Sequence, residues 1–173
     1  MELLKDRSGI EGKFFELCSS IAHENGYELY DLEYLGGSKL LRLYIMDKKT
    51  QSALIEDCVK IDHALTPYFE SETWMPEEVT LEVSSPGIYR TLRTFDHFQM
   101  VLGKTIATVL NKNLSGEKYK EMPKSITAEK KLKGKLLNVS DSGVVLNIGK
   151  FDVEIPFENL KKANLEEDLD FKK

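Results

Sequence analysis

The sequence predicts an α+β protein with two domains: a helix-and-sheet sandwich over residues 1–90 and a small closed β-barrel over residues 91–173. Three observations support this prediction. Apolar residues follow helical spacing in two stretches of the first half, and glycine-containing turns separate the strand-like runs beside them. The second half contains many short strand-like runs with tight turns, and closing them into a barrel would remove exposed strand edges. A chain of 173 residues is long enough for two small cores.

The first half is predicted to begin with an amphipathic helix. Ser8 and Glu11 fit a capping box, and Gly26 suits the left-handed conformation that closes a helix. The apolar stripe of this helix consists of Ile10, Phe14, Leu17, Cys18 and Ile21. Two strands follow, at about 27–35 and 40–46, with Gly36-Gly37-Ser38 as their hairpin turn. In the second strand, Leu41, Leu43 and Ile45 alternate with Arg42 and Tyr44, which indicates one buried face.

A second helix is predicted from about Leu54, and Thr66-Pro67 is expected to interrupt it because proline loses a helical hydrogen bond. Its predicted apolar side contains Ile55, Cys58, Ile61 and Leu65. The acidic stretch 70–78 is interpreted as a loop, and 79–83 as a third strand. The order α-β-β-α-β predicts one three-stranded sheet with both helices on a single face.

The second half is predicted to begin with one capped helical turn over residues 94–98. Strands are expected at 105–110, 132–139, 144–148, 151–155 and 161–165, with a 3₁₀ turn at 156–160 before the last. The lysine-rich segment 112–130 is expected to be a protruding loop, and the acidic run at 166–168 a frayed tail.

Charge is distributed unevenly along the chain, whose net charge is −5. Residues 1–90 hold 9 Lys and Arg against 17 Asp and Glu, whereas residues 91–173 hold 15 against 12. Residues 97–135 contain nine lysines and three glutamates. The overall charge argues against simple bulk binding to nucleic acid. The lysine-rich stretch has two interpretations that the sequence leaves open, a solvated loop and a basic stripe that lies against RNA.

Other features predict a soluble protein of a reducing cytoplasm. No apolar run approaches the roughly 20 residues that a membrane-spanning helix needs. The first residues lack the apolar core of a secretory signal. The two cysteines, Cys18 and Cys58, each lie alone in an apolar pattern and are interpreted as small core residues without a disulfide.

Tests for catalytic chemistry favour a binding module over an enzyme. Ser84 and Ser85 follow a strand but lack the leading glycine of a nucleophile elbow. The three histidines are scattered, and no phosphate loop, dinucleotide fingerprint or zinc spacing occurs. Asp31, Glu33 and Glu82 could cluster as metal ligands, but no periodic pattern supports a metal site. The sequence therefore predicts no catalytic residues, no metal and no cofactor.

The segment Ser84-Ser85-Pro86-Gly87 is interpreted as a stiff corner between the two domains. Pro86 restricts φ and Gly87 permits positive φ, which suits positions i+1 and i+2 of a type II turn. The two serines would satisfy backbone groups at the strand end. Arg90 and Arg93 follow, and their guanidinium groups would either hold the domains together or contact a phosphate.

Five segments carry a resemblance to a known family. "LEVSSPGIYRTL" (81–92) resembles the signature Leu-Glu-Val-Ser-Ser-Pro-Gly-x-x-Arg-x-Leu of the RimP family of ribosome maturation factors. The other segments are "ENGYELYDLEY" (24–34), "LRLYI" (41–45), "IEDCVKI" (55–61) and "IPFENLKKANL" (155–165). Two departures stand out. Tyr89 and Thr91 replace the family's usual aspartate and second proline, and the aspartate after the second strand is shifted to Asp47 with no glycine before the second helix.

The resemblance implies an N-terminal α/β domain followed by an SH3-like, Sm-like β-barrel. It implies a factor for assembly of the small (30S) ribosomal subunit, which binds the free subunit through the twelfth small-subunit protein, near the decoding centre, and through adjacent rRNA. A monomer and no membrane partner are expected. The residues predicted to contact rRNA are Arg90, Arg93, Lys104, Lys133 and Lys135. The alternative is an independent Sm-like regulator that binds small RNAs as a ring, and an enzyme ranks third.

Overall fold

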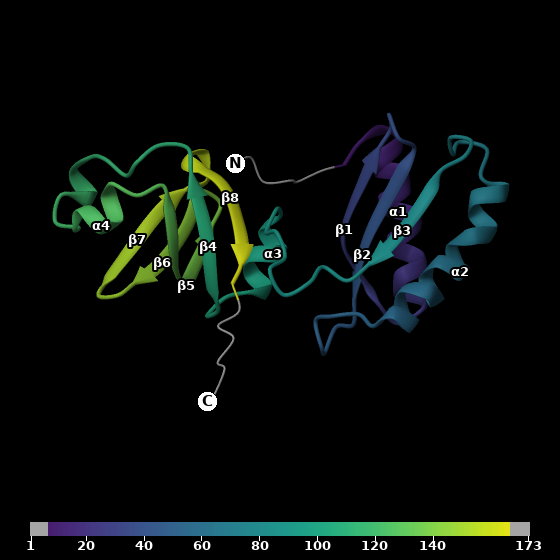
Figure 1. Cartoon of the computed structure of the whole chain (residues 1–173), viewed down its shortest axis with the longest axis horizontal. Helices are drawn as coiled ribbons and strands as arrows, with labels where there is room; N and C mark the ends of the chain where they lie inside the picture. The colour runs from purple at the N-terminus through teal and green to yellow at the C-terminus, as the bar shows by residue number, and fades with distance from the viewer. Residues whose placement is uncertain (1–6, 167–173) are drawn as a thin grey trace. The chain divides into compact units, whose positions relative to one another are not determined.

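The computed structural model of the chain describes residues 7–166 and has an α+β architecture, as the sequence predicts (Figure 1). The chain divides into two compact units, and the boundary lies between Gly87 and Ile88. Each unit has its own hydrophobic core. The acidic run expected to form a tail extends beyond the described residues, since only its first member, Glu166, lies within them.

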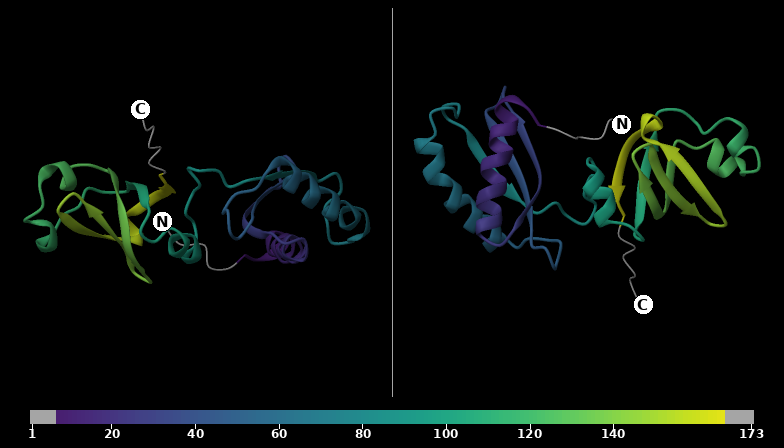
Figure 2. Two further views of the ribbon diagram at one scale, coloured as in Figure 1. Left: turned by 90° about the horizontal axis from the view of Figure 1, so that it is seen from below. Right: turned by 180° about the vertical axis from the view of Figure 1, so that it is seen from behind.

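The first unit has the predicted order α-β-β-α-β. Its elements are α1 (Gly9–Glu24), β1 (Glu28–Leu35), β2 (Leu40–Met46), α2 (Ile55–Ser71) and β3 (Thr80–Ser84). The strand order in the sheet is β1-β2-β3, in which β1 is antiparallel to β2 and β3 is parallel to it. Figure 2 shows α1 and α2 beside each other against this sheet. A parallel β2–β3 pair requires a crossover connection, and α2 supplies it.

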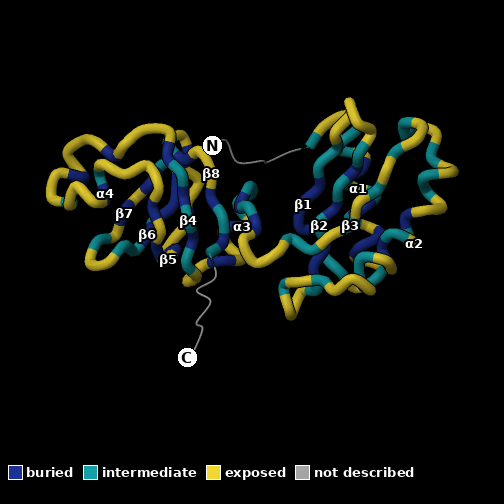
Figure 3. The backbone as a smooth tube through the Cα atoms, in the orientation of Figure 1, coloured by how far each residue is buried: buried dark blue, intermediate teal, exposed yellow. Residues whose placement is uncertain are grey.

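One hydrophobic cluster joins both helices to all three strands. Phe14 and Cys18 from α1, Leu43 from β2, and Ile61 and Leu65 from α2 are buried in it. The buried residues of β2 are Leu41, Leu43, Ile45 and Met46, so the predicted alternation is confirmed for the first three (Figure 3). Gly26 has φ +90° just after the end of α1, which confirms the predicted left-handed closure.

Three local predictions for this unit are wrong. Ser8 is the N-cap of α1, but its side chain makes no capping hydrogen bond, and Glu11 instead pairs with Arg7. Ile55 was expected to face the core, yet it is 80% exposed. The helix does not stop at Thr66-Pro67 but continues to Ser71. Packing of the buried Ile61 and Leu65 outweighs the roughly 3 kcal/mol that an interior proline costs a helix.

The second unit consists mainly of one antiparallel sheet of five strands in the order β7-β6-β5-β4-β8. Its strands are β4 (Thr105–Leu110), β5 (Lys131–Ser140), β6 (Gly143–Ile148), β7 (Phe151–Pro156) and β8 (Leu160–Leu165), which confirms all five predicted strands. The short helix α3 (Phe95–Met100) precedes them, and the Thr94 side chain caps it by accepting from the backbone N–H of His97. The 3₁₀ turn η2 (Phe157–Asn159) joins β7 to β8, where it was predicted.

The expected closed barrel is not observed within the described residues, because β7 and β8 are the outer strands of the sheet and do not pair. The η2 turn lies between them and redirects the chain. The segment 112–130 covers part of the open edge, since the Tyr119 hydroxyl donates to the Glu154 carbonyl of β7 at 2.8 Å. This segment is not a simple protruding loop. It forms the 3₁₀ turn η1 (Glu117–Tyr119) and the short helix α4 (Lys124–Thr127), and it buries Leu114, Tyr119 and Ile126 in the core.

Candidate nucleic-acid interface

A row of lysines follows the solvent-facing side of β5. Lys131, Lys133 and Lys135 are exposed, whereas Leu132, Gly134 and Leu136 between and after them are buried. Successive side chains of a strand point to opposite faces, so this alternation places the three ammonium groups on one face of the sheet. The buried leucines hold the strand against the core, and the row is therefore presented by a rigid element rather than by a loop.

On one side of β5, strands β4 and β8 contribute short side chains to this face. Lys135 lies opposite Thr105 of β4, and Lys133 lies opposite Ala107. Ala107 in turn lies opposite Asn164 of β8, which is paired with Thr91 on its other side. Short side chains beside long ones leave the lysines accessible from above the sheet. We call Lys131, Lys133 and Lys135 the lysine face.

Lys104 lies next to β5, just before the start of β4. Its backbone carbonyl accepts a hydrogen bond from the N–H of Leu136 at 2.9 Å. A Cβ atom built on the neighbouring Gly103 would lie 4.0 Å from Cε of Lys135. The structure therefore brings two of the five residues predicted to bind rRNA, Lys133 and Lys135, onto one face, whereas Lys104 is exposed and lies opposite the buried Leu136. Glu166 moderates their charge, since it lies 3.3 Å from the Lys133 ammonium group.

The two predicted arginines are placed differently from the lysines. Arg90 is only 6% exposed, and its carbonyl accepts from the N–H of Leu165 at 2.9 Å. Arg93 is half-buried, and its N–H donates to Nδ1 of His97 at 3.1 Å. A buried guanidinium group does not reach a phosphate on the surface, so the geometry gives Arg90 a place in the packing of its own unit.

Two further lysines belong to the same region, and the sequence argument did not select them. Lys131 is separated from Lys133 by one residue, as Lys133 is from Lys135, so this alternation in the sequence could have predicted that Lys131 lies on the same face of β5. Lys162 of β8 faces Val109 of β4, and Val109 faces Lys131, so Lys131 and Lys162 lie in one row across the sheet. Nothing in local sequence marks this second relation, because it depends on the register between distant strands. At one edge of the sheet, β7 presents the acidic Asp152 and Glu154, and Asp152 lies in one cross-strand row with Asn147 and Lys135.

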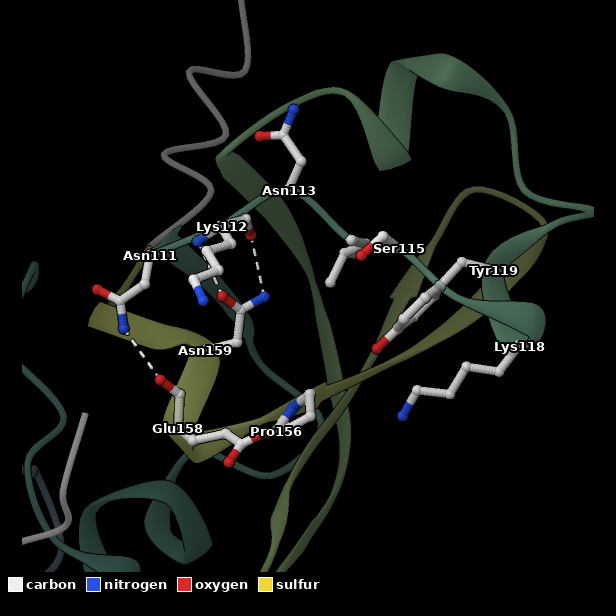
Figure 4. Close-up of a pocket in the computed structure, with 10 residues that line it drawn as sticks. Asn111, Lys112, Asn113, Ser115, Lys118, Tyr119, Pro156, Glu158 and Asn159 are labelled. Carbon is white, nitrogen blue, oxygen red and sulfur yellow. Dashed lines mark hydrogen bonds between the residues drawn. The ribbon is translucent and has the colours of Figure 1, made fainter.

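A hollow of about 570 Å³ lies between the start of the β4–β5 connection and η2 (Figure 4). The side-chain amides of Asn111 and Asn159, which line it, form hydrogen bonds with backbone groups. The Asn159 side chain accepts from the N–H of Lys112 at 2.9 Å and donates to the Lys112 carbonyl at 3.0 Å. Asn111 donates to the Glu158 carbonyl at 3.0 Å. Lys118 lies over the Tyr119 ring, 5.1 Å from its centre. These bonds tie the connection to η2.

The Ser84–Gly87 corner lies at the end of β3, where the first unit ends. Gly87 has φ +74°, in the region that favours glycine. Its N–H donates to the Ser85 hydroxyl at 3.3 Å, and the Ser84 hydroxyl donates to the Ser85 carbonyl at 3.3 Å. The hydrogen-bonded turn lies at Ile88 and Tyr89 rather than at Pro86 and Gly87. The Ser85 side chain therefore satisfies a backbone N–H just after the strand end.

The carboxylates considered as metal ligands are engaged by arginines. Arg7 pairs with Asp31, and Arg42 lies 2.8 Å from Glu82 and 3.5 Å from Glu33. Across residues 7–166, no group of three or more His, Cys, Asp or Glu side chains is arranged to hold a metal ion. Cys18 and Cys58 are free thiols, and burial raises the pKa of the Cys18 thiol to about 12. No helix in the described part of the chain is long and apolar enough to cross a membrane.

A protein-family model described as the RimP N-terminal domain matches residues 17–89 of the chain. The matched region runs from the last turns of α1 through the three-stranded sheet and α2 to the Ser84–Gly87 corner. It contains three of the five segments on which the resemblance rests and most of a fourth, residues 81–89 of 81–92, whereas the fifth, at 155–165, lies in the second unit.

Proposed function

We propose, from the premise that the chain belongs to the RimP family of ribosome maturation factors, that it assists assembly of the small (30S) ribosomal subunit. In this proposal it binds the free subunit during maturation and leaves before translation. Its partners are the twelfth small-subunit protein, near the decoding centre, and the rRNA next to it. The protein acts as a monomer in the cytoplasm, without a cofactor and without catalysing a reaction.

The lysine face is the observation that carries the rRNA part of this proposal. Alternate residues of a strand are about 6.7 Å apart, so β5 presents its three ammonium groups as a regular line of positive charge. Lysines that neutralise phosphates release condensed counterions, and this release supplies much of the affinity for nucleic acid. Arg93 and Lys162 extend the positive surface in the proposal. The first domain, residues 1–90, is acidic and is better suited to a basic protein than to rRNA.

We infer further that the second domain, residues 91–173, is of the SH3-like class. Five antiparallel strands with a 3₁₀ turn before the last support this inference. A register shift between Leu136 and Asn138 in β5 supports it as well, because a bulge lets one strand bend and serve both halves of a curled sheet. In the same proposal, the Ser84–Gly87 corner serves as the stiff connection between the domains.

The alternative function, an Sm-like ring that binds small RNAs, needs subunits to pair through the edges of their sheets. The outer edge of β8 is occupied in this chain, since Leu92 donates to the Ala163 carbonyl at 2.9 Å and Thr91 bridges to Asn164. Tyr119 occupies part of the β7 edge. These contacts favour the monomeric assembly factor. Sedimentation equilibrium separates the two functions, because a ring would show a stable oligomer.

The first prediction tests the lysine face by charge reversal. The double variant Lys133→Glu, Lys135→Glu should co-sediment less with purified small subunits than the wild-type protein does. The slope of log affinity against log salt should fall in magnitude by about 1.4 to 1.8, because two phosphate contacts are lost. Both lysines are exposed, so the melting temperature should change little.

The control variant is Lys172→Glu, Lys173→Glu, which makes the same change of net charge outside the lysine face. It should bind like the wild-type protein at every salt concentration. If the Lys133/Lys135 variant also binds like the wild-type protein at every salt concentration, the lysine face is not part of the rRNA contact.

A further inference from the structure

A second hollow lies in the first unit, between the beginning of α2 and the end of β3. Its volume is about 410 Å³. It is lined by Ala53, Leu54, Ile55, Cys58, Val59, Asp62, Val83, Ser84 and Ser85. We call it the α2–β3 groove. Most of its lining is apolar, and the lysine face belongs to the other unit.

The apolar lining of this groove is unusually exposed. Leu54 is 69% exposed, Ile55 is 80% exposed and Val59 is 47% exposed. Ile55 and Val59 are four residues apart on α2 and therefore lie on the same side of the helix. Large apolar side chains gathered at one hollow mark a contact surface, whereas single exposed ones do not. A partner that covers this group would remove its apolar area from water, which is favourable.

Asp62 is the one charged residue that lines the groove. Its carboxylate forms no ion pair or hydrogen bond with any residue in the range 7–166. Thr66 bonds only to the backbone carbonyl of Asp62, at 3.0 Å. An unpaired, half-buried carboxylate in an apolar hollow favours a cation and repels a phosphate. The chemistry of the groove therefore selects a basic polypeptide over a nucleic acid.

The edge of β3 offers backbone hydrogen bonds beside the groove. β3 pairs only with β2, and the N–H of Thr80 donates to the Lys39 carbonyl at 2.8 Å. Backbone groups alternate in direction along a strand, so those of Leu81 and Val83 point away from β2. None of the hydrogen bonds within the described region uses the N–H or the carbonyl of Leu81 or Val83 on this side. The edge is open where Val83 meets the groove.

We propose that the α2–β3 groove binds an extended, lysine- or arginine-rich segment of a ribosomal protein, which adds a strand to the edge of β3. An apolar side chain of that segment fills the space between Leu54, Ile55 and Val59, and a cationic side chain pairs with Asp62. Main-chain bonds to an edge strand give affinity, and pockets for alternate side chains give specificity. The source of the segment, a protein of the small subunit, rests on the function proposed above.

The second prediction tests this binding with peptides. Synthetic 12-residue peptides that tile the proteins of purified small subunits are titrated into the full-length protein, and fluorescence polarisation measures binding. At least one basic peptide should bind, and Asp62→Lys and Ile55→Ser should each weaken it about tenfold, the effect of roughly 1.4 kcal/mol. Glu70→Lys and Leu35→Ser are the controls, because they make the same changes at exposed positions of α2 and β1 outside the groove.

A second measurement reports the added strand directly. Amide hydrogen exchange at Val83 and Leu81 should slow several-fold when the peptide binds, while exchange at Gly37 in the hairpin turn stays the same. Unchanged exchange at Val83 together with full binding by Asp62→Lys would overturn the proposal. Tighter binding of an RNA oligonucleotide than of any peptide, lost in Ile55→Ser, would also overturn it and assign the groove to nucleic acid. Binding of a purely acidic peptide would overturn the charge argument.

Peptide binding tests the groove, and co-sedimentation with small subunits tests the assembly function, so the two proposals can fail independently. If the wild-type protein co-sediments with small subunits but no peptide binds, the groove proposal fails and the assembly function stands. If peptides bind at the groove but the protein does not co-sediment with small subunits, the groove is supported and the assembly function fails.

Discussion

Gly134 lies between Lys133 and Lys135 in β5. Because it has no side chain, β6 can approach closely enough to pair with β5. A Cβ atom at this position would lie 2.6 Å from the Asn147 carbonyl oxygen and 2.8 Å from Cγ1 of Ile148. Real Cβ atoms do not approach a backbone oxygen so closely, so any larger residue would push the two strands apart. The same position must also stay buried to keep Lys133 and Lys135 on the outer face.

The third prediction follows from this close approach. Gly134→Ala should lower the free energy of unfolding by about 1–3 kcal/mol, the usual cost of overpacking a close contact. Denaturant unfolding followed by circular dichroism measures it. Gly37→Ala is the control, because nothing lies within 4 Å of a Cβ atom there, and it should cost well under that amount. A Gly134→Ala variant as stable as Gly37→Ala would show that β5 and β6 lie further apart than described.

At the scale of single elements, Asp57 joins the beginning of α2 to Tyr27, the residue just before β1. Its carboxylate accepts the N–H of Leu54 at 2.8 Å and the hydroxyl of Tyr27. These bonds favour the charged carboxylate, so the Tyr27 hydroxyl first and the Leu54 N–H second lower the pKa of Asp57 below its ordinary value. The same hydrogen bond to Asp57 raises the pKa of Tyr27 to about 12. Leu54 contributes no side-chain cap, and Asp57 therefore caps the helix from within its first turn.

The fourth prediction concerns pH. Because the pKa of Asp57 is lower in the folded than in the unfolded state, its stabilisation is present above the unfolded value of about 3.9 and is lost as pH falls through the lower folded value. Asp57→Asn should lower the melting temperature at pH 7 and make its decrease below pH 4 shallower. Glu56→Gln, on the same exposed turn, is the control and should change neither. Because the pKa of Tyr27 is raised, Tyr27 should titrate near 12 by NMR, and nearer 10 in Asp57→Asn.

At the scale of the whole molecule, the two units have separate cores and opposite charge. No residue is shared between the hydrophobic clusters of the two units. Residues 1–90 carry a net charge of −8 and residues 91–173 carry +3. In the proposals above, the basic unit binds rRNA through the lysine face, and the acidic unit binds a basic protein segment through the α2–β3 groove.

The fifth prediction is that fragments 6–87 and 88–173 fold independently. Each should show a cooperative thermal transition by circular dichroism, because each buries its own core. Fragment 88–173 should bind small subunits with the salt dependence of the lysine face, and 6–87 with a weaker one. A fragment that lacks a cooperative transition would show that its unit depends on the other half of the chain.

The order and limits of the elements were largely predictable from sequence because they depend on neighbouring residues. The alternation in β2, the Thr94 cap and the glycine after α1 are signals that act within a few positions. The family match over residues 17–89 agrees with the resemblance carried by the segments at 24–34, 41–45 and 55–61. Lys133 and Lys135 lie on one face of β5 because a strand turns a spacing of two residues directly into a common face, and their contact with rRNA stays a prediction.

What only the tertiary structure decided depends on contacts between distant residues. Whether Arg90 is buried, whether Lys162 lies beside Lys131, and whether the five strands close into a barrel all depend on strand register across the sheet. The exposure of Ile55 and the continuation of α2 through Pro67 depend on how the helix packs on β3 and the core. Local sequence determines which backbone conformations are favourable. The burial of one segment against another, whose free energy exceeds those local preferences, determines which side chains the protein presents to its partners.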